Sequence, residues 1–306
     1  MNFTNKLKLR PDGKIIFKNF SYLSLLRLFS IVSQYIIISI LVRSLGDEKY
    51  GLFVWAFSVI QYLVIVINFG FNTYAAKYVP ENIDDPANLN RVFSAILSFK
   101  LFLFFISSVL FLFLVSNIPV FTENWHLLLI LLGFGLGEAI FPIWLFQGKE
   151  KLEIPTKIIF TFKMLLVLSV LIFITSNEHL LRYAFLMSAV QIVIGLTGLY
   201  FAFSKLNMQF IRVSKSNLYK VIKEAFPFFI GAVFGKSFHF FAVFLIGLYF
   251  SMEDVAGFDI SFKIMAAIQL PFETLSTVIF PSIARTKNIK LNEKLIFISF
   301  GLALLL

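Results

Sequence analysis

Long apolar runs constrain this chain more than any other feature of its sequence. Eight runs exceed the roughly 20 residues that an α-helix needs to cross about 30 Å of hydrocarbon. They are residues 20–43, 51–73, 92–116, 124–147, 155–176, 180–204, 225–250 and 256–282. A ninth run begins at residue 295. The sequence therefore predicts an all-α, polytopic membrane protein.

The cations between these runs are distributed unevenly. When the runs are threaded alternately through a bilayer, nineteen of the 27 lysines and arginines fall on the side of the N-terminus, and three fall on the other side. Cytoplasmic loops of membrane proteins are enriched in lysine and arginine. We therefore expect an inner-membrane protein whose N-terminus lies in the cytoplasm, as does the segment from Lys205 to Lys223.

Composition excludes several classes of protein. A chain of 306 residues that is 59% hydrophobic has little room for a soluble domain. There is no cysteine, and His126, His179 and His239 lack metal-site spacing. Gly148-Lys149 lacks the upstream glycine and the following hydroxyl of an ATP-binding loop. We therefore expect no metal, no cofactor and no enzymatic activity. The net charge of +10 lies mostly in short loops facing lipid headgroups, so no nucleic-acid partner is expected.

Two short segments are similar at an offset of 206 residues. LGDEKYGLF (45–53) aligns without gaps to SMEDVAGFD (251–259), and both have two acids before a glycine at the start of a run. The acids are expected to cap a helix N-terminus, and Gly51 and Gly257 to let the chain reverse. Six runs separate the copies, so both enter the membrane in the same direction. This predicts a parallel repeat of two six-helix lobes enclosing a cavity; the alternative is chance similarity of two turns.

The repeat also predicts the domain organisation. Residues 1–208 would form the N-terminal six-helix lobe, and residues 209–306 an incomplete C-terminal lobe. The second copy contains about three runs, and the last has only 12 residues, from Leu295 to Leu306. Because that run is too short to cross a bilayer, the chain is expected to be truncated.

Charged residues within the runs are candidate functional groups, because burying a charge in a membrane is costly unless it is paired or hydrated. Helical spacing or matched depth suggests three pairs, each with either a structural or an ion-coupling role. The pairs are Asp259 with Lys263, Glu138 with Lys163, and Lys236 with Glu273.

Two cations in the first lobe, Arg27 and Lys100, remain without a partner in this scheme. They are expected either to reach back to the headgroups or to line a hydrated cavity and bind an anionic group such as diphosphate. Lys236 and His239, three residues apart on one helix face, would form the facing wall of that cavity. Alternatively, His239 is a packing residue.

Glycines and prolines interrupt several runs. Gly133, Gly135 and Gly137 lie within one run and predict close packing between helices rather than a nucleotide fingerprint. Pro142 and Gly70 are among the positions where kinks are expected.

Three stretches carry a resemblance to a known family. LVRSLGDEKYGLFVWAFSVIQYLVIVINFGFNTYAAKYVPE (41–81) resembles the first hairpin of the Wzx-type oligosaccharide flippases, which belong to the multidrug/oligosaccharidyl-lipid/polysaccharide exporter superfamily. FPIWLFQGKEKL (141–152) resembles the end of that family's fourth span, and residues 226–285 resemble the opening of its second lobe.

The resemblance implies flipping of an undecaprenyl-diphosphate-linked oligosaccharide, such as an O-antigen repeat unit, by alternating access coupled to an ion gradient. The implied partners are that substrate, membrane lipids and polysaccharide assembly proteins. One alternative is a small-molecule exporter of the multidrug and toxin extrusion type, although an exporter of cationic drugs should have an acidic cavity. A second is a glycan polymerase or ligase, which needs an outer active-site loop longer than those predicted here.

Overall fold

The computed structural model describes the backbone of residues 11–286 and the side chains of residues 28–269 apart from Lys236. This described part is helical, with short connections and no strand. Its helices are α1 (Pro11–Asn68), α2 (Phe71–Glu81), α3 (Pro86–Asn117), α4 (Pro119–Glu123), α5 (Trp125–Ile140), α6 (Ile143–Gly148), α7 (Glu153–Phe173), the 3₁₀ helix η2 (Asn177–His179), α8 (Leu180–Leu206), α9 (Lys215–Tyr249) and α10 (Met252–Thr286). The predicted all-α class is confirmed.

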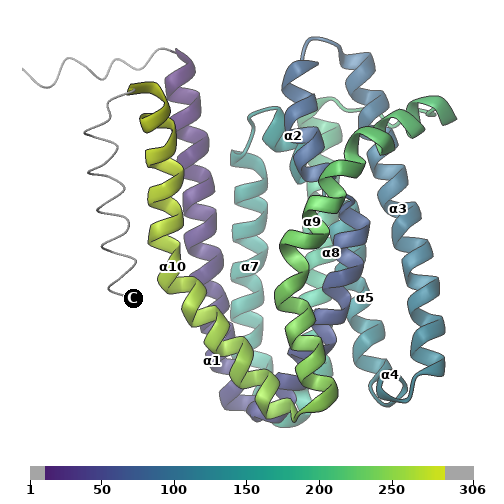
Figure 1. The fold of residues 1–306 in the computed structure, drawn as a ribbon, viewed down its shortest axis with the longest axis vertical. Helices are drawn as coiled ribbons and strands as arrows, with labels where there is room; N and C mark the ends of the chain where they lie inside the picture. Colours follow the sequence, from purple (N-terminus) through teal and green to yellow (C-terminus); the bar gives the residue numbers. More distant parts are fainter. Residues whose placement is uncertain (1–10, 287–306) are drawn as a thin grey trace, which may run out of the picture. The chain divides into compact units, whose positions relative to one another are not determined.

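The helices have the length and apolarity of membrane spans. Within the described residues, five helical segments could cross a bilayer, or six if the bent α9 is counted as one span. The first segment, Leu28–Glu81, has 54 residues. This segment covers most of the predicted run 20–43 and all of the run 51–73. Helix α1 reverses direction between these two runs, descending in purple and rising again in blue in Figure 1. The prediction of a multi-pass membrane protein is confirmed; the two six-helix lobes stay a prediction, and the run from Leu295 lies outside the described residues.

The reversal within α1 occurs at Gly46, whose φ of 80° and ψ of 167° are not helical. A positive φ strains any residue with a Cβ atom, so glycine suits this turn. The expectation that Gly51 and Gly257 allow the chain to reverse was wrong, because both lie within helices. The expected acidic cap is present at the second turn, where Asp254 Oδ2 accepts a hydrogen bond from the Ser251 backbone N–H (3.1 Å).

Two predicted kinks are present as helix breaks. Gly70, with a φ of 70°, separates α1 from α2. Pro142 separates α5 from α6, since it lacks an N–H group for the helix ladder. In both places one apolar run becomes a long helix followed by a short one.

Helices α5 and α8 pack closely through small residues. A Cβ atom on Gly137 would collide with the backbone carbonyl of Gln191, and one on Gly195 would lie 2.6 Å from the carbonyl oxygen of Gly137. Gly133 faces the Cβ of Ser188, whereas Gly135 contacts other helices. Close helix packing at this glycine stripe, as predicted, is confirmed.

Helix α9 follows the second half of α1 over its length, as Figure 1 also shows. A Cβ atom on Gly247 would meet the ring of Trp55, and one on Gly51 would meet the backbone carbonyl of Met252, the first residue of α10. Further contacts join Tyr62 Oη to the Ser237 carbonyl (3.2 Å), the ring of Phe69 to that of Phe229 (4.7 Å between centroids) and Gly70 to the backbone of Phe228 and Phe229.

The contacts divide the chain into two compact units, Met1–Ala256 and Gly257–Leu306. The first unit contains the helices from α1 to α9, with tightly packed aromatic side chains such as Trp55, Trp144 and Phe93 in its core. Within the second unit, Lys263 Nζ and Asp259 Oδ2 form an ion pair at 2.6 Å, four residues apart on α10. This is the arrangement that helical spacing suggests.

Candidate functional site

The first candidate site is a group of polar side chains inside the first unit, which we call the buried charge cluster. It consists of Ser30 on α1, Lys100 on α3, Glu138 on α5, Lys163 on α7 and Gln191 on α8. Lys100 is only 2% exposed, and its Nζ donates a hydrogen bond to the backbone carbonyl of Glu138 at 2.7 Å. Lys100 therefore does not face the lipid.

The carboxylate of Glu138 has a partner on a different helix. Its Oε1 accepts a hydrogen bond from Gln191 Nε2 at 2.7 Å. The close approach of α5 and α8 at Gly137 and Gly195 allows this contact, because short backbone separation brings the adjacent side chains together.

Lys163 lies at the edge of the same cluster. Its Nζ donates to Ser30 Oγ at 3.4 Å, and both Lys163 and Lys100 lie within electrostatic range of the Glu138 carboxylate. Matched depth suggested a pair between Glu138 and Lys163; in the structure their hydrogen bonds go to Gln191 and Ser30 instead.

The buried charge cluster has two amines for one carboxylate. Polar groups in an apolar interior need partners, and an unbalanced charge favours an ion of the opposite sign. Chemically, this arrangement can hold a helix bundle together and attract an anion towards its interior. Gln191 and Ser30 were missed by reasoning that considered only ionisable groups; an amide within the run 180–204, four residues before Gly195, was the available signal.

The other predicted site residues are placed as follows. His239 lies on α9 with its ring beside that of Phe240 (5.5 Å between centroids). Arg27, Lys236 and Glu273 lie within α1, α9 and α10, and their side chains are outside the described residues. Of the four predicted cavity residues, only Lys100 and His239 have described side chains, so the cavity stays a prediction.

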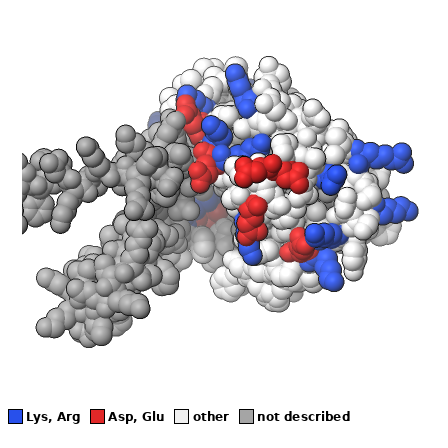
Figure 2. Space-filling view, turned by 90° about the horizontal axis from the view of Figure 1, so that it is seen from above, with Lys and Arg blue, Asp and Glu red and all other residues white. Residues whose placement is uncertain are grey.

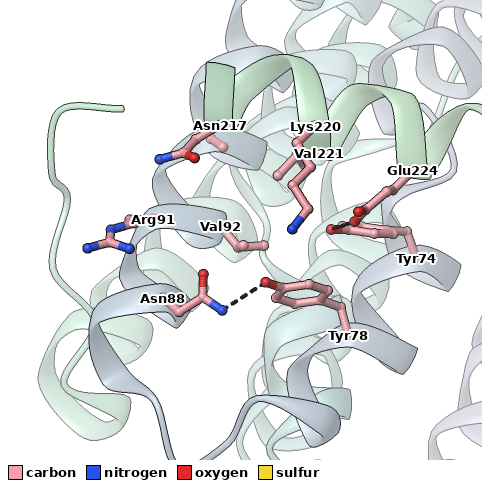
Figure 3. Close-up of a pocket in the computed structure, with 10 residues that line it drawn as sticks. Tyr74, Tyr78, Asn88, Arg91, Val92, Asn217, Lys220, Val221 and Glu224 are labelled. Carbon is pink, nitrogen blue, oxygen red and sulfur yellow. Dashed lines mark hydrogen bonds between the residues drawn. The ribbon is translucent and has the colours of Figure 1, made fainter. Parts of the chain in front are cut away.

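A second candidate site is a cavity of about 60 Å³ between α2, α3 and α9, which we call the open pocket (Figure 3). Its polar lining residues are Tyr74, Tyr78, Asn88, Arg91, Asn217, Lys220 and Glu224. Tyr74 Oη donates to Glu224 Oε2 at 2.9 Å, and Asn88 Nδ2 donates to Tyr78 Oη at 2.8 Å. Sequence reasoning missed this pocket, because its residues lie in the connections between runs and at their ends.

The open pocket lies at the end of the bundle that the cation distribution predicts to be cytoplasmic. Figure 2 shows this end, with lysine and arginine side chains spread over it and acidic side chains between them. Just outside the membrane-spanning segments here, partial burial lowers the pKa of Lys149, whose Nζ donates to the Leu206 carbonyl at 3.2 Å. This end therefore holds cations in both packed and exposed positions.

Comparison with known proteins identifies one family and two similar relatives. The family model described as "Polysaccharide biosynthesis protein" matches residues 16–287. A curated relative from Escherichia coli (strain K12) is 23% identical over 92% of this chain, and one from Shigella dysenteriae is 22% identical over 91%. Both are described as "Putative O-antigen transporter". The chain spans 66% and 70% of these relatives, about two thirds of their length. No solved structure gives a significant match.

Proposed function

We propose, on the premise that the chain belongs to the polysaccharide biosynthesis protein family, that it acts in a flippase for lipid-linked oligosaccharides. The substrate class is an undecaprenyl-diphosphate-linked repeat unit of O-antigen or another surface polysaccharide. The observation that carries this proposal is the family match over residues 16–287. The descriptions of the two relatives as O-antigen transporters and the series of apolar helices support it.

The proposed location is the bacterial inner membrane, with the N-terminus in the cytoplasm. The charge distribution along the sequence supports this orientation, because cations concentrate in alternate connections. The work is transport rather than bond chemistry, with no cofactor.

In the proposed mechanism, cations inside the bundle attract the diphosphate while the prenyl chain stays in lipid. The excess of amines over carboxylates in the buried charge cluster supports this role for the first lobe. Rocking of two lobes about the site would then expose the oligosaccharide to the other side of the membrane. Lys100 and Arg27 are the residues to test, with Lys236 and His239 as the facing wall.

The test is complementation of a deletion strain with variants of the full-length protein. We expect Lys100→Gln and Arg27→Gln to reduce surface polysaccharide while the protein level in the membrane stays unchanged. Glutamine can still donate a hydrogen bond to the Glu138 carbonyl, so the fold should persist. Lys205→Gln, at an exposed position, is the matched control and should leave polysaccharide unchanged.

Unchanged polysaccharide in both variants would count against these cations as the substrate site. Loss of polysaccharide in the deletion strain itself tests the function. A deletion strain with normal polysaccharide and increased drug sensitivity would favour the small-molecule exporter instead.

A further inference from the structure

We propose that the open pocket binds a phosphate group carried by the headgroup of a membrane lipid. The pocket is separate from the buried charge cluster, and this inference does not depend on the transport function. It depends on four properties of the pocket: unpaired cations, an available hydroxyl donor, two helix N-termini and an apolar surface leading away from it.

The cations of the open pocket have no partner among the residues that the structure describes. Arg91 on α3 and Lys220 on α9 both line it and are exposed. Neither forms a hydrogen bond or an ion pair with any other part of the chain that the structure describes. Figure 3 shows the Lys220 amine directed into the space beside Tyr78, with Arg91 at the edge of the pocket. Two unpaired cations at one cavity favour an anionic ligand.

The acidic residue of the open pocket is already engaged. Glu224 accepts the hydrogen bond from Tyr74 Oη at 2.9 Å, and Figure 3 shows the two side chains together on one side of the cavity. One carboxylate against two cations leaves a net positive charge. The hydrogen bond to Tyr74 holds this carboxylate beside the tyrosine.

Tyr78 supplies a hydroxyl that can donate to a ligand. Its oxygen accepts the hydrogen bond from Asn88 Nδ2 at 2.8 Å, so its own hydrogen is not used in that contact. Asn88 Nδ2 also bonds Asn82 Oδ1 at 3.1 Å, which fixes the amide orientation. A phosphate oxygen beside Lys220 would therefore meet an ammonium and a phenol donor together.

Two helix N-termini contribute to the same region. Asn88 is the third residue of α3 and Asn217 is the third residue of α9, and both line the open pocket. Each backbone N–H is capped, by Asp85 Oδ1 at 3.0 Å and by Ser214 Oγ at 3.3 Å. The helix dipoles add partial positive charge near the pocket, and the side chains supply the contacts.

The volume of the open pocket suits a phosphate group. A cavity needs at least roughly 10–15 Å³ to hold one water molecule, so the pocket of about 60 Å³ has room for a group larger than a single water. A phosphate group has four oxygens. A sugar ring is larger, so the pocket is proposed for the phosphate alone.

The surface beyond the pocket indicates that the phosphate belongs to a lipid. Phe102 and Phe105 on α3 are 53% and 66% exposed. Phe102 follows Arg91 by eleven residues, about three helical turns or roughly 16 Å, so both lie on one helix face. A lipid with its phosphate at Arg91 could lay its acyl chains along these phenylalanines. Free phosphate would make no use of that surface.

The experiment measures binding of short-chain lipids to the purified full-length protein in detergent, by calorimetry. The probes are dihexanoyl phosphatidylglycerol, dihexanoyl phosphatidylethanolamine and inorganic phosphate. We expect Lys220→Gln and Arg91→Gln each to weaken phosphatidylglycerol binding by roughly tenfold, equivalent to about 1.4 kcal/mol. Lys223→Gln is the matched control on α9, because Lys223 is exposed and does not line the pocket; its affinity should change less than about twofold, that is by less than about 0.4 kcal/mol.

The lipid comparison identifies the source of the phosphate. Tighter binding of either lipid than of inorganic phosphate supports a headgroup site, and the preferred lipid shows whether a net negative charge is needed. If Lys220→Gln and Lys223→Gln weaken lipid binding equally, the lipid is attracted diffusely to a charged surface and the proposed pocket site is wrong. Binding of inorganic phosphate as tight as that of both lipids would overturn the lipid assignment.

Tyr78→Phe removes only the hydroxyl. This variant should weaken lipid binding without changing the helical circular dichroism, and unchanged lipid binding would contradict the proposed contact.

Discussion

Lys100 and Lys220 lie on helices of the same unit but are held in opposite ways. Lys100 is 2% exposed and donates to a backbone carbonyl, whereas Lys220 is exposed at the open pocket and has no described protein partner. A buried charge must be compensated by its surroundings, so its partners become part of the fold. An exposed cation costs the fold little and keeps its hydrogen-bonding capacity for a ligand. Loss of the carboxylate of the buried charge cluster should therefore lower stability, whereas loss of a cation of the open pocket should lower only binding.

The largest loss of stability is expected for Glu138→Leu, which removes the acceptor of Gln191 Nε2 and the one negative charge that offsets the Lys100 and Lys163 amines. Removing one member of a buried charged group costs about 3–5 kcal/mol. The measurement is denaturant unfolding of the purified protein in detergent. Glu138→Gln, which keeps an acceptor for Gln191, should lose less stability than Glu138→Leu. Equal stability of Glu138→Leu and wild type would show that the cluster is not structural.

A smaller loss of stability is expected for Gly137→Ala, because the added methyl group meets the backbone of Gln191 and must separate α5 from α8. Overpacking of this kind costs about 1–3 kcal/mol. The control is Gly231→Ala, where the described residues leave a Cβ atom free of contacts within 4 Å. If both variants unfold at the same denaturant concentration, the close approach of α5 and α8 does not support the cluster.

Tyr74→Phe removes the hydrogen bond to Glu224 and should cost about 1 kcal/mol in the same unfolding assay. It should also weaken lipid binding, because the released carboxylate can then pair with Lys220. Tyr219→Phe, at a tyrosine that is 66% exposed, serves as the control for loss of a hydroxyl. Tighter lipid binding in Tyr74→Phe would contradict the role given to Glu224.

The smallest effect on stability is expected for Lys220→Gln, less than about 0.5 kcal/mol, as for other surface substitutions. The same variant should lose lipid affinity, so the two measurements separate stability from binding. A loss of stability close to that of Glu138→Leu would remove the distinction between the two regions.

The membrane helices could be predicted from sequence because the length of an apolar run depends only on consecutive residues. The predicted runs differ from the helices mainly at their ends, and at Gly70 and Pro142, where backbone conformation interrupts an apolar stretch. The site of reversal was less predictable. Gly46 and Gly51 lie close together in the sequence, and only the packing of Met252 at the start of α10 shows that Gly51 is needed for contact rather than for conformation.

The partners of the charged residues could be predicted only when they were close in sequence. Lys263 lies four residues after Asp259, so helix geometry alone specified their contact. Gln191 is 53 residues from Glu138, and its position depends on how closely two helices pack. The open pocket is formed by residues near positions 74, 91 and 220, which lie on three different helices. No pattern within one segment of the sequence indicates that these residues are close in space.

The contact between α9 and the second half of α1 has a mechanical consequence. Any movement that separates these helices must withdraw Gly247 from the ring of Trp55 and the Ser237 carbonyl from Tyr62 in the same event, because one continuous seam joins them. A seam of this length resists tilting of one helix alone. Helix α9 is therefore attached to the helices that precede it, and Met252 at the start of α10 extends this attachment past the turn at Ser251.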